Sequence, residues 1–203
     1  MGFFLTRGHV LGTPEQEFWN WFEKQEDALF NFEQDQQNVF AALTVQLHKV
    51  HESLTFEFGP KEDNKREFVI SADGIKDAFP KVISLYDAAP KLPHWTFIKF
   101  RPRREPMDVS YGGENVPAVE VSFVLKKEGN KIGVTLFMPR VIEQNRQAMT
   151  GIAFLLLDQA LGEYDVETKV GSIEAKPINA APPEKKPLKE LSKSFDAAVA
   201  EMK

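Results

Sequence analysis

The sequence predicts an α+β protein with a mainly antiparallel sheet of about six to seven strands, packed by an N-terminal α-hairpin and two further helices. Apolar residues recur at helical spacing in some segments and alternate with polar residues in others. Two alternating segments are joined by the short turn Glu128-Gly129-Asn130, a hairpin signal. The expected order, α-α-β-β-α-β-β-β-β-α-β, places strands next to one another, which favours antiparallel pairing.

The amino-terminal elements are two helices and a strand pair. Thr13-Pro14-Glu15 has the residues of a helix N-cap, a first-turn proline and an acidic first turn. A second helix is expected over residues 36–52, where an apolar stripe recurs at the same spacing. Residues 54–58 alternate and end at Gly59-Pro60, so they predict a strand, with residues 66–71 as its hairpin partner.

The middle and last elements are a helix, four strands, a central helix and a final strand. Pro80 belongs in the first turn of a helix lying between residues 74 and 92, because an interior proline would cost about 3 kcal/mol. The helix expected over residues 144–161 is apolar around most of its circumference, which predicts a central position, and Gly162 ends it. The expected strands are residues 95–104, 109–111, 116–127, 131–139 and 166–175.

Composition changes at Lys176 and divides the chain into three parts. Residues 1–176 are expected to form a single α+β domain, and residues 177–187, which contain four prolines, a stiff Pro-rich linker. Residues 188–203 predict a C-terminal amphipathic helix whose apolar stripe needs a covering surface. That surface is either the same domain or another subunit, so the stripe is a candidate interface for a protein partner or a homo-oligomer. The stripe comprises Leu188, Leu191, Phe195 and Met202.

Composition also limits the chemistry and the compartment. The chain has 203 residues and no cysteine, which excludes disulfides, thiolate nucleophiles and cysteine-based metal sites. The net charge of −5 argues against nucleic acid as a partner. Arg7 interrupts a short apolar start, and the longest apolar run is far below the ~20 residues of a membrane helix, so we expect a cytoplasmic protein without a membrane partner.

The segment 95–104 carries the residues most suited to ligand binding. Strand alternation would place aromatic and basic side chains on one face, which suits single-stranded nucleic acid or an anionic small molecule. The alternative is a strand that leaves the core with its basic end solvated or paired to acids, and the acidic net charge favours this alternative. The candidate surface comprises Trp95, Phe97, Lys99, Arg101, Arg103 and Arg104.

An acidic segment, residues 163–167, offers a partner for those cations. Its three carboxylates would alternate on one face of extended chain and could hold Mg²⁺ or Ca²⁺. Pairing with the basic segment explains both clusters, so we expect at least one of Glu163, Asp165 and Glu167 within ion-pair reach of an arginine of the basic segment. His48 and His51 supply only two ligands, and no phosphate-binding glycine loop is present, so neither metal nor cofactor is expected.

One part of the chain resembles a known group of sequences. Ile70-Ser71-Ala72-Asp73-Gly74-Ile75, Phe79-Pro80-Lys81-Val82 and Phe100-Arg101-Pro102-Arg103 look like a segment, here residues 70–104, of a family of uncharacterised bacterial proteins of about this length. The resemblance implies a bacterial cytosolic origin. It brings no activity, ligand or catalytic residue.

The leading hypothesis from the sequence is a non-catalytic binding or protein-interaction module. The alternative is a hydrolase or transferase that acts on an anionic substrate held by Arg101 and Arg103, with a carboxylate for acid–base work. A pocket with a raised-pKa carboxylate beside those arginines would favour the enzyme, whereas a flat apolar surface would favour the interaction module. No catalytic residue is identified.

Overall fold

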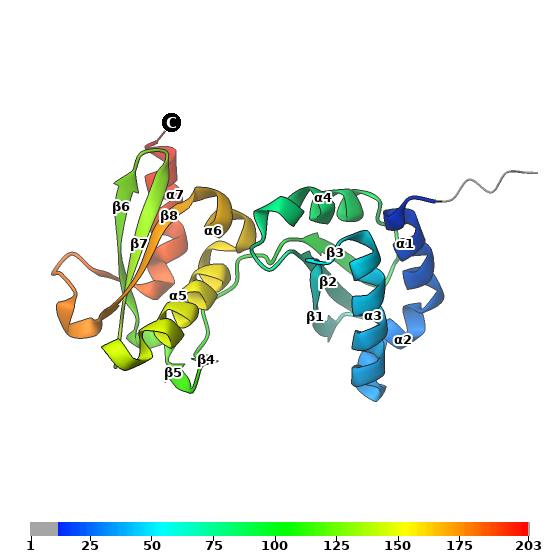
Figure 1. Ribbon diagram of the computed structural model, residues 1–203, viewed down its shortest axis with the longest axis horizontal. Coiled ribbons are helices and arrows are strands. Elements are labelled where there is room, and N and C mark those ends of the chain that lie inside the picture. Colours follow the sequence, from blue (N-terminus) through cyan, green and yellow to red (C-terminus); the bar gives the residue numbers. More distant parts are fainter. Residues whose placement is uncertain (1–11, 203) are drawn as a thin grey trace, which may run out of the picture. The chain divides into compact units, whose positions relative to one another are not determined.

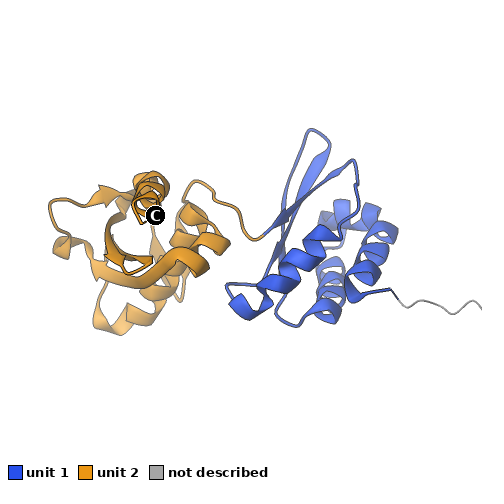
Figure 2. Ribbon diagram, turned by 90° about the horizontal axis from the view of Figure 1, so that it is seen from above, with its two compact units in different colours: residues 1–99 blue, residues 100–203 orange. Residues whose placement is uncertain are grey.

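The computed structural model describes residues 12–202 and shows an α+β protein (Figure 1). Arg7 and the rest of the chain's start lie outside the described residues. The chain divides into two compact units, Met1–Lys99 and Phe100–Lys203 (Figure 2). This division differs from the single domain expected over residues 1–176. The expected strand 95–104 stops at Lys99, because the next residue, Phe100, has a φ of 63° and turns the backbone out of the extended conformation.

The helices of unit 1 begin where the sequence predicts. Thr13 caps α1, and its hydroxyl accepts a hydrogen bond from the Gln16 backbone N–H while the Gln16 side chain accepts one from Thr13. The two helices expected at the amino end are α1 and α3, but a short helix and a 3₁₀ turn lie between them. Pro80 lies in the first turn of α4, as predicted. The helices are α1 Pro14–Lys24, α2 Glu26–Phe30, η1 Phe32–Gln34, α3 Gln36–Val50, η2 Lys76–Ala78 and α4 Phe79–Asp87.

The sheet of unit 1 has three strands in the order β1-β2-β3. β1 (Thr55–Glu62) pairs antiparallel with β2 (Lys65–Ser71), and β3 (Trp95–Lys99) pairs parallel with β2. Gly59-Pro60 does not end the first strand, as the sequence had predicted, but lies in an irregularity of register between Phe58 and Lys61. The turn is Asp63-Asn64, where both residues have positive φ, a conformation that Asp and Asn tolerate.

Aromatic rings form the core of unit 1. Phe22 of α1 lies 5.1 Å from Phe68 of β2 and 4.9 Å from Trp95 of β3, measured between ring centroids. The indole Nε1 of Trp19 donates a 2.7 Å hydrogen bond to the Leu85 carbonyl and so joins α1 to α4. Phenylalanine and tryptophan rings from α1, β2 and β3 therefore build the core of this unit.

The strands of unit 2 form two further sheets, so the six to seven expected strands do not share one sheet. A hairpin of β4 and β5 stands apart from a four-stranded sheet of order β8-β7-β6-β9, in which β7 and β8 run parallel and the other pairs antiparallel. The predicted hairpin across Gly129 is β6–β7. The strands are β4 Val109–Tyr111, β5 Glu114–Val116, β6 Ser122–Glu128, β7 Lys131–Met138, β8 Val170–Pro177 and β9 Lys186–Pro187.

Helix α5 (Arg146–Leu161) is the central helix of unit 2, as its apolar sequence predicts. The residues after it are not extended, as had been expected from residue 166, but form α6 (Glu163–Lys169). Gly162 separates the two helices with a φ of 77°, which a side chain would strain. Asp165 and Lys169, one turn apart in α6, form a 2.6 Å ion pair.

The carboxyl-terminal segment is part of unit 2. Residues 177–187 are not a simple linker, because they contain the 3₁₀ turn η5 (Ile178–Ala180) and the strand β9. After η6 (Leu188–Glu190), helix α7 (Leu191–Ala200) packs on the core. Three of the four stripe residues, Leu188, Leu191 and Phe195, are buried there, and Met202 packs against the same cluster. The fold-back alternative is therefore the observed one, because the three buried residues pack in the core of unit 2 itself.

Candidate functional site

The basic residues after Lys99 lie against the end of α5 and the start of α6. Nη1 of the Arg101 guanidinium is 3.1 Å from Asp158 Oδ2. The backbone N–H of Arg101 donates a hydrogen bond to Glu163 Oε2 at 3.1 Å. The Glu163 N–H donates in turn to the Arg101 carbonyl at 3.1 Å. A Cβ at Gly162 would lie 3.0 Å from that carbonyl, so glycine permits this close approach.

Arg103 joins three helices of unit 2. Its Nε donates to the Leu161 carbonyl at the end of α5, at 3.0 Å. Its two terminal nitrogens donate to Asp196 of α7 at 2.8 Å, and Nη2 also donates to Asp165 of α6 at 2.5 Å. The hydrogen bonds from Arg103 lower the pKa of the Asp196 carboxyl. Arg103 is thus a structural clamp that neutralises two carboxylates.

The predicted pairing of the acidic and basic segments is confirmed by the Arg103–Asp165 ion pair. The geometry expected for this pairing was wrong, because the carboxylates lie on a helix rather than alternating along a strand.

In the described residues 12–202, no group of three or more His, Asp or Glu side chains is arranged to hold a metal ion. The His51 ring Nδ1 accepts a hydrogen bond from the Ser53 N–H.

The continuous aromatic and basic surface predicted over residues 95–104 is not formed by a single strand. Trp95 is buried in the core of unit 1, and the Phe97 ring lies 4.6 Å from that of Trp19. Lys99 ends β3 with its ammonium over the Tyr86 ring at 4.9 Å. The arginines belong to unit 2, so the strand alternation on which the predicted surface depended ends at Lys99.

Burial raises the pKa of the Asp158 carboxyl to about 6, while Arg101 lowers it and Glu163 and Glu167 raise it further. The folded chain therefore holds this proton more tightly than the unfolded chain does. Between about pH 4 and pH 6, the contribution of Asp158 to stability should fall as pH rises, by at most about 3 kcal/mol, and then stay constant.

The variant Asp158→Asn, which does not titrate, isolates this effect. As the pH rises from 4 to 7, the stability of the variant relative to that of the parent chain should increase, because only the parent loses stability over this range. Denaturant unfolding followed through amide exchange of β6 and β7 measures the difference. A difference that stays constant over this range would contradict the raised pKa.

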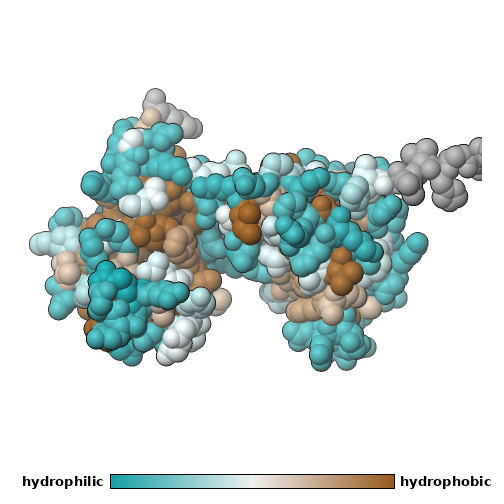
Figure 3. All heavy atoms as spheres, viewed as in Figure 1, coloured by the Kyte–Doolittle hydropathy of each residue, from teal (hydrophilic) through white to brown (hydrophobic). Residues whose placement is uncertain are grey.

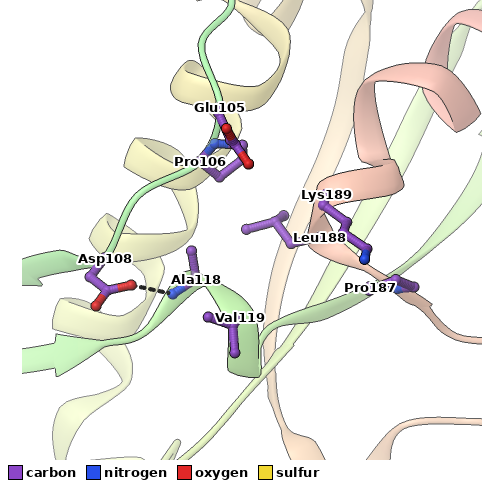
Figure 4. Close-up of a pocket in the computed structure, with 8 residues that line it drawn as sticks. All are labelled: Glu105, Pro106, Asp108, Ala118, Val119, Pro187, Leu188 and Lys189. Atoms are coloured by element: carbon purple, nitrogen blue, oxygen red, sulfur yellow. Dashed lines mark hydrogen bonds between the residues drawn. The ribbon is translucent and has the colours of Figure 1, made fainter.

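A pocket of about 420 Å³ lies elsewhere in unit 2, between two neighbouring segments and a third that is distant from them in sequence (Figure 4). The first, residues 105–108, is held in place because the Met107 N–H donates to Gln159 Oε1 at 2.6 Å and Asp108 Oδ1 accepts from the Ala118 N–H at 2.9 Å. The other two lie in the 3₁₀ turns η3 (Ala118–Glu120) and η6. The lining residues are Glu105, Pro106, Asp108, Ala118, Val119, Pro187, Leu188 and Lys189.

The pocket combines an apolar interior with charged walls. Ala118 and Leu188 are buried beneath it, whereas Val119 is 87% exposed, more than any other large hydrophobic residue described. Figure 4 shows Glu105 and Asp108 on one side and Lys189 on the other. The Glu105 and Lys189 side chains form no hydrogen bond or ion pair with the described part of the chain.

Sequence reasoning did not select these lining residues, apart from Leu188. A local signal was present, because each lining segment contains or follows a proline, at 106, 117 or 187, that interrupts regular structure. No local pattern indicates that the three segments meet, since their pairing depends on the sheet and on α5.

Comparison with protein-family models, with curated proteins and with solved structures found no significant match. Among residues 12–202, no helix has the length and apolar character to cross a membrane. On the face shown in Figure 3, hydrophilic residues predominate and hydrophobic residues gather in small patches. The site must therefore be judged on its geometry alone.

Proposed function

We propose that this protein is a non-catalytic binding module whose binding site is the pocket lined by residues 105–108, 118–119 and 187–189. The observation that supports it is a concavity of about 420 Å³ whose apolar interior adjoins the charged groups Glu105 and Lys189, neither of which has a partner in the described chain. Ligand sites of proteins typically have volumes of about 300–1,000 Å³, with a few polar groups that orient the ligand.

The enzyme alternative keeps one supporting observation. Asp158 is a carboxylate with a pKa raised to about 6 beside Arg101, the combination that the sequence analysis associated with acid–base chemistry. Against it, Arg101 binds Asp158 and Arg103 binds Asp165 and Asp196, so both guanidiniums already have anionic partners. Neither arginine lines the pocket, and we give binding the preference.

The proposal is tested by screening a library of small cationic, anionic and neutral molecules against the full ¹⁵N-labelled chain. Val119→Asp should weaken a pocket ligand about tenfold or more, because it places a charge at the apolar edge of the site. Ile142→Asp is the matched control, since Ile142 is also an exposed apolar residue of unit 2 but does not line the pocket.

Resonance shifts confined to the three lining segments, lost in Val119→Asp and kept in Ile142→Asp, would support the binding module. A library without any ligand for these segments would contradict it. Shifts centred on Arg101 and Asp158 instead would favour the enzyme alternative.

A further inference from the structure

The two sides of the pocket carry opposite charges. Glu105 and Asp108 come from one segment without regular secondary structure. Asp108 is oriented because its Oδ1 accepts a hydrogen bond from the Ala118 N–H, which leaves Oδ2 for a ligand. Lys189 comes from η6, which is attached to the end of η3, just before β6, by the 3.0 Å hydrogen bond from the Leu188 N–H to the Val121 carbonyl. A ligand that satisfies both sides must carry a cation at one end and an anion at the other.

The space between the charges is apolar and small. Pro106, Ala118 and Leu188 offer carbon surface rather than hydrogen-bonding side chains. A volume of about 420 Å³ is at the lower end of the range for ligand sites, which is about 300–1,000 Å³. A longer polymer would have to leave the pocket at one end, whereas a short ligand with both charges can be held entirely within it.

We infer that the pocket binds a short free peptide of apolar residues, with its amino end at Glu105 and Asp108 and its carboxyl end at Lys189. This inference rests on the proposed binding function and names its ligand class. A dipeptide or tripeptide has the required charges at opposite ends of an apolar body. The charged side chains are exposed, so each end should contribute modestly, with about a two- to fivefold loss of affinity when it is removed.

The experiment uses the full chain and the dipeptide Ala-Leu, with binding measured from resonance shifts. N-acetyl-Ala-Leu lacks the cation and Ala-Leu amide lacks the anion, so each should bind about two- to fivefold more weakly than Ala-Leu. Glu105→Gln with Asp108→Asn keeps the shape and the acceptor for Ala118 while removing the negative charge. Lys189→Met removes the positive charge, and Lys193→Met, outside the pocket, is its control.

The proposal is supported if Glu105→Gln/Asp108→Asn binds Ala-Leu and N-acetyl-Ala-Leu with equal affinity, and if Lys189→Met binds Ala-Leu and Ala-Leu amide with equal affinity. Lys193→Met should show the same affinities as the parent chain. Equal binding of free and capped peptides in the pocket would overturn the ligand class but keep the binding module. The same holds if Ala-Leu fails at millimolar concentration while a library molecule binds the lining segments. If nothing binds those segments, the proposed function itself fails.

Discussion

Truncation of the chain after Lys176 is expected to unfold unit 2 and to leave unit 1 folded. The removed residues include Leu188, Leu191 and Phe195, which are buried in the core of unit 2. Each such side chain contributes about 1.5–3 kcal/mol on burial, and the cavity left behind costs more. A loss of this size reaches the total stability of a typical domain, about 5–15 kcal/mol.

The two units can be followed separately in the same sample. All three tryptophans, Trp19, Trp21 and Trp95, lie in unit 1, so tryptophan fluorescence reports the unfolding of that unit. Amide exchange of β6 and β7 reports unit 2. Phe195→Ala should reproduce part of the effect in the full-length chain, with a loss of about 3–5 kcal/mol, whereas Lys193→Ala on the exposed side of α7 should change little. Protected β6 amides in the truncated chain would show that α7 is peripheral.

Local patterns predicted the elements well and their assembly poorly. Thr13-Pro14-Glu15 and the apolar residues of 144–161 act within one helix, so the sequence places α1 and α5 correctly. The parallel pairing of β2 with β3 joins residues about thirty positions apart across α4, and its sign was the expected strand–helix–strand order rather than any local pattern. The acidic segment 163–167 was wrongly predicted to be extended, because its alternating carboxylates also fit a strand. Its better signal was the one-turn spacing of Asp165 and Lys169.

The candidate site could likewise be predicted only where it depends on a simple pairing of charges. Opposite charges in two segments were enough to predict that Arg103 meets an acidic residue, because buried or half-buried charges require partners. The pocket depends on three segments, of which two are separated from the third by the whole of β6, β7 and β8. The burial of Arg66 could not be predicted from the sequence either. Arg66 follows the charged residues of a turn, where an exposed side chain is expected, and yet it is only 2% exposed.

Arg66→Ala is expected to destabilise unit 1 by about 2–5 kcal/mol, the cost of deleting a large buried side chain. The guanidinium lies against aromatic rings, with its Cζ 4.3 Å from the centre of Phe32, and it forms an ion pair with Glu33. The hydrogen bond from Arg66 lowers the pKa of the Glu33 carboxyl. Alanine would leave a space between Phe30, Phe32 and Phe58, whose rings all lie within 6 Å of Cζ.

Arg66→Met separates packing from charge. Nε and Nη1 of Arg66 are buried without a hydrogen-bond partner among the described residues, and such donors are costly. Methionine fills a similar volume without them, so it should keep the parent stability within about 1 kcal/mol or raise it. Urea unfolding followed by tryptophan fluorescence measures both variants, with the exposed neighbour variant Lys65→Met as control. If methionine costs as much as alanine, the ion pair and the ring contacts of the cation stabilise unit 1, and packing volume does not.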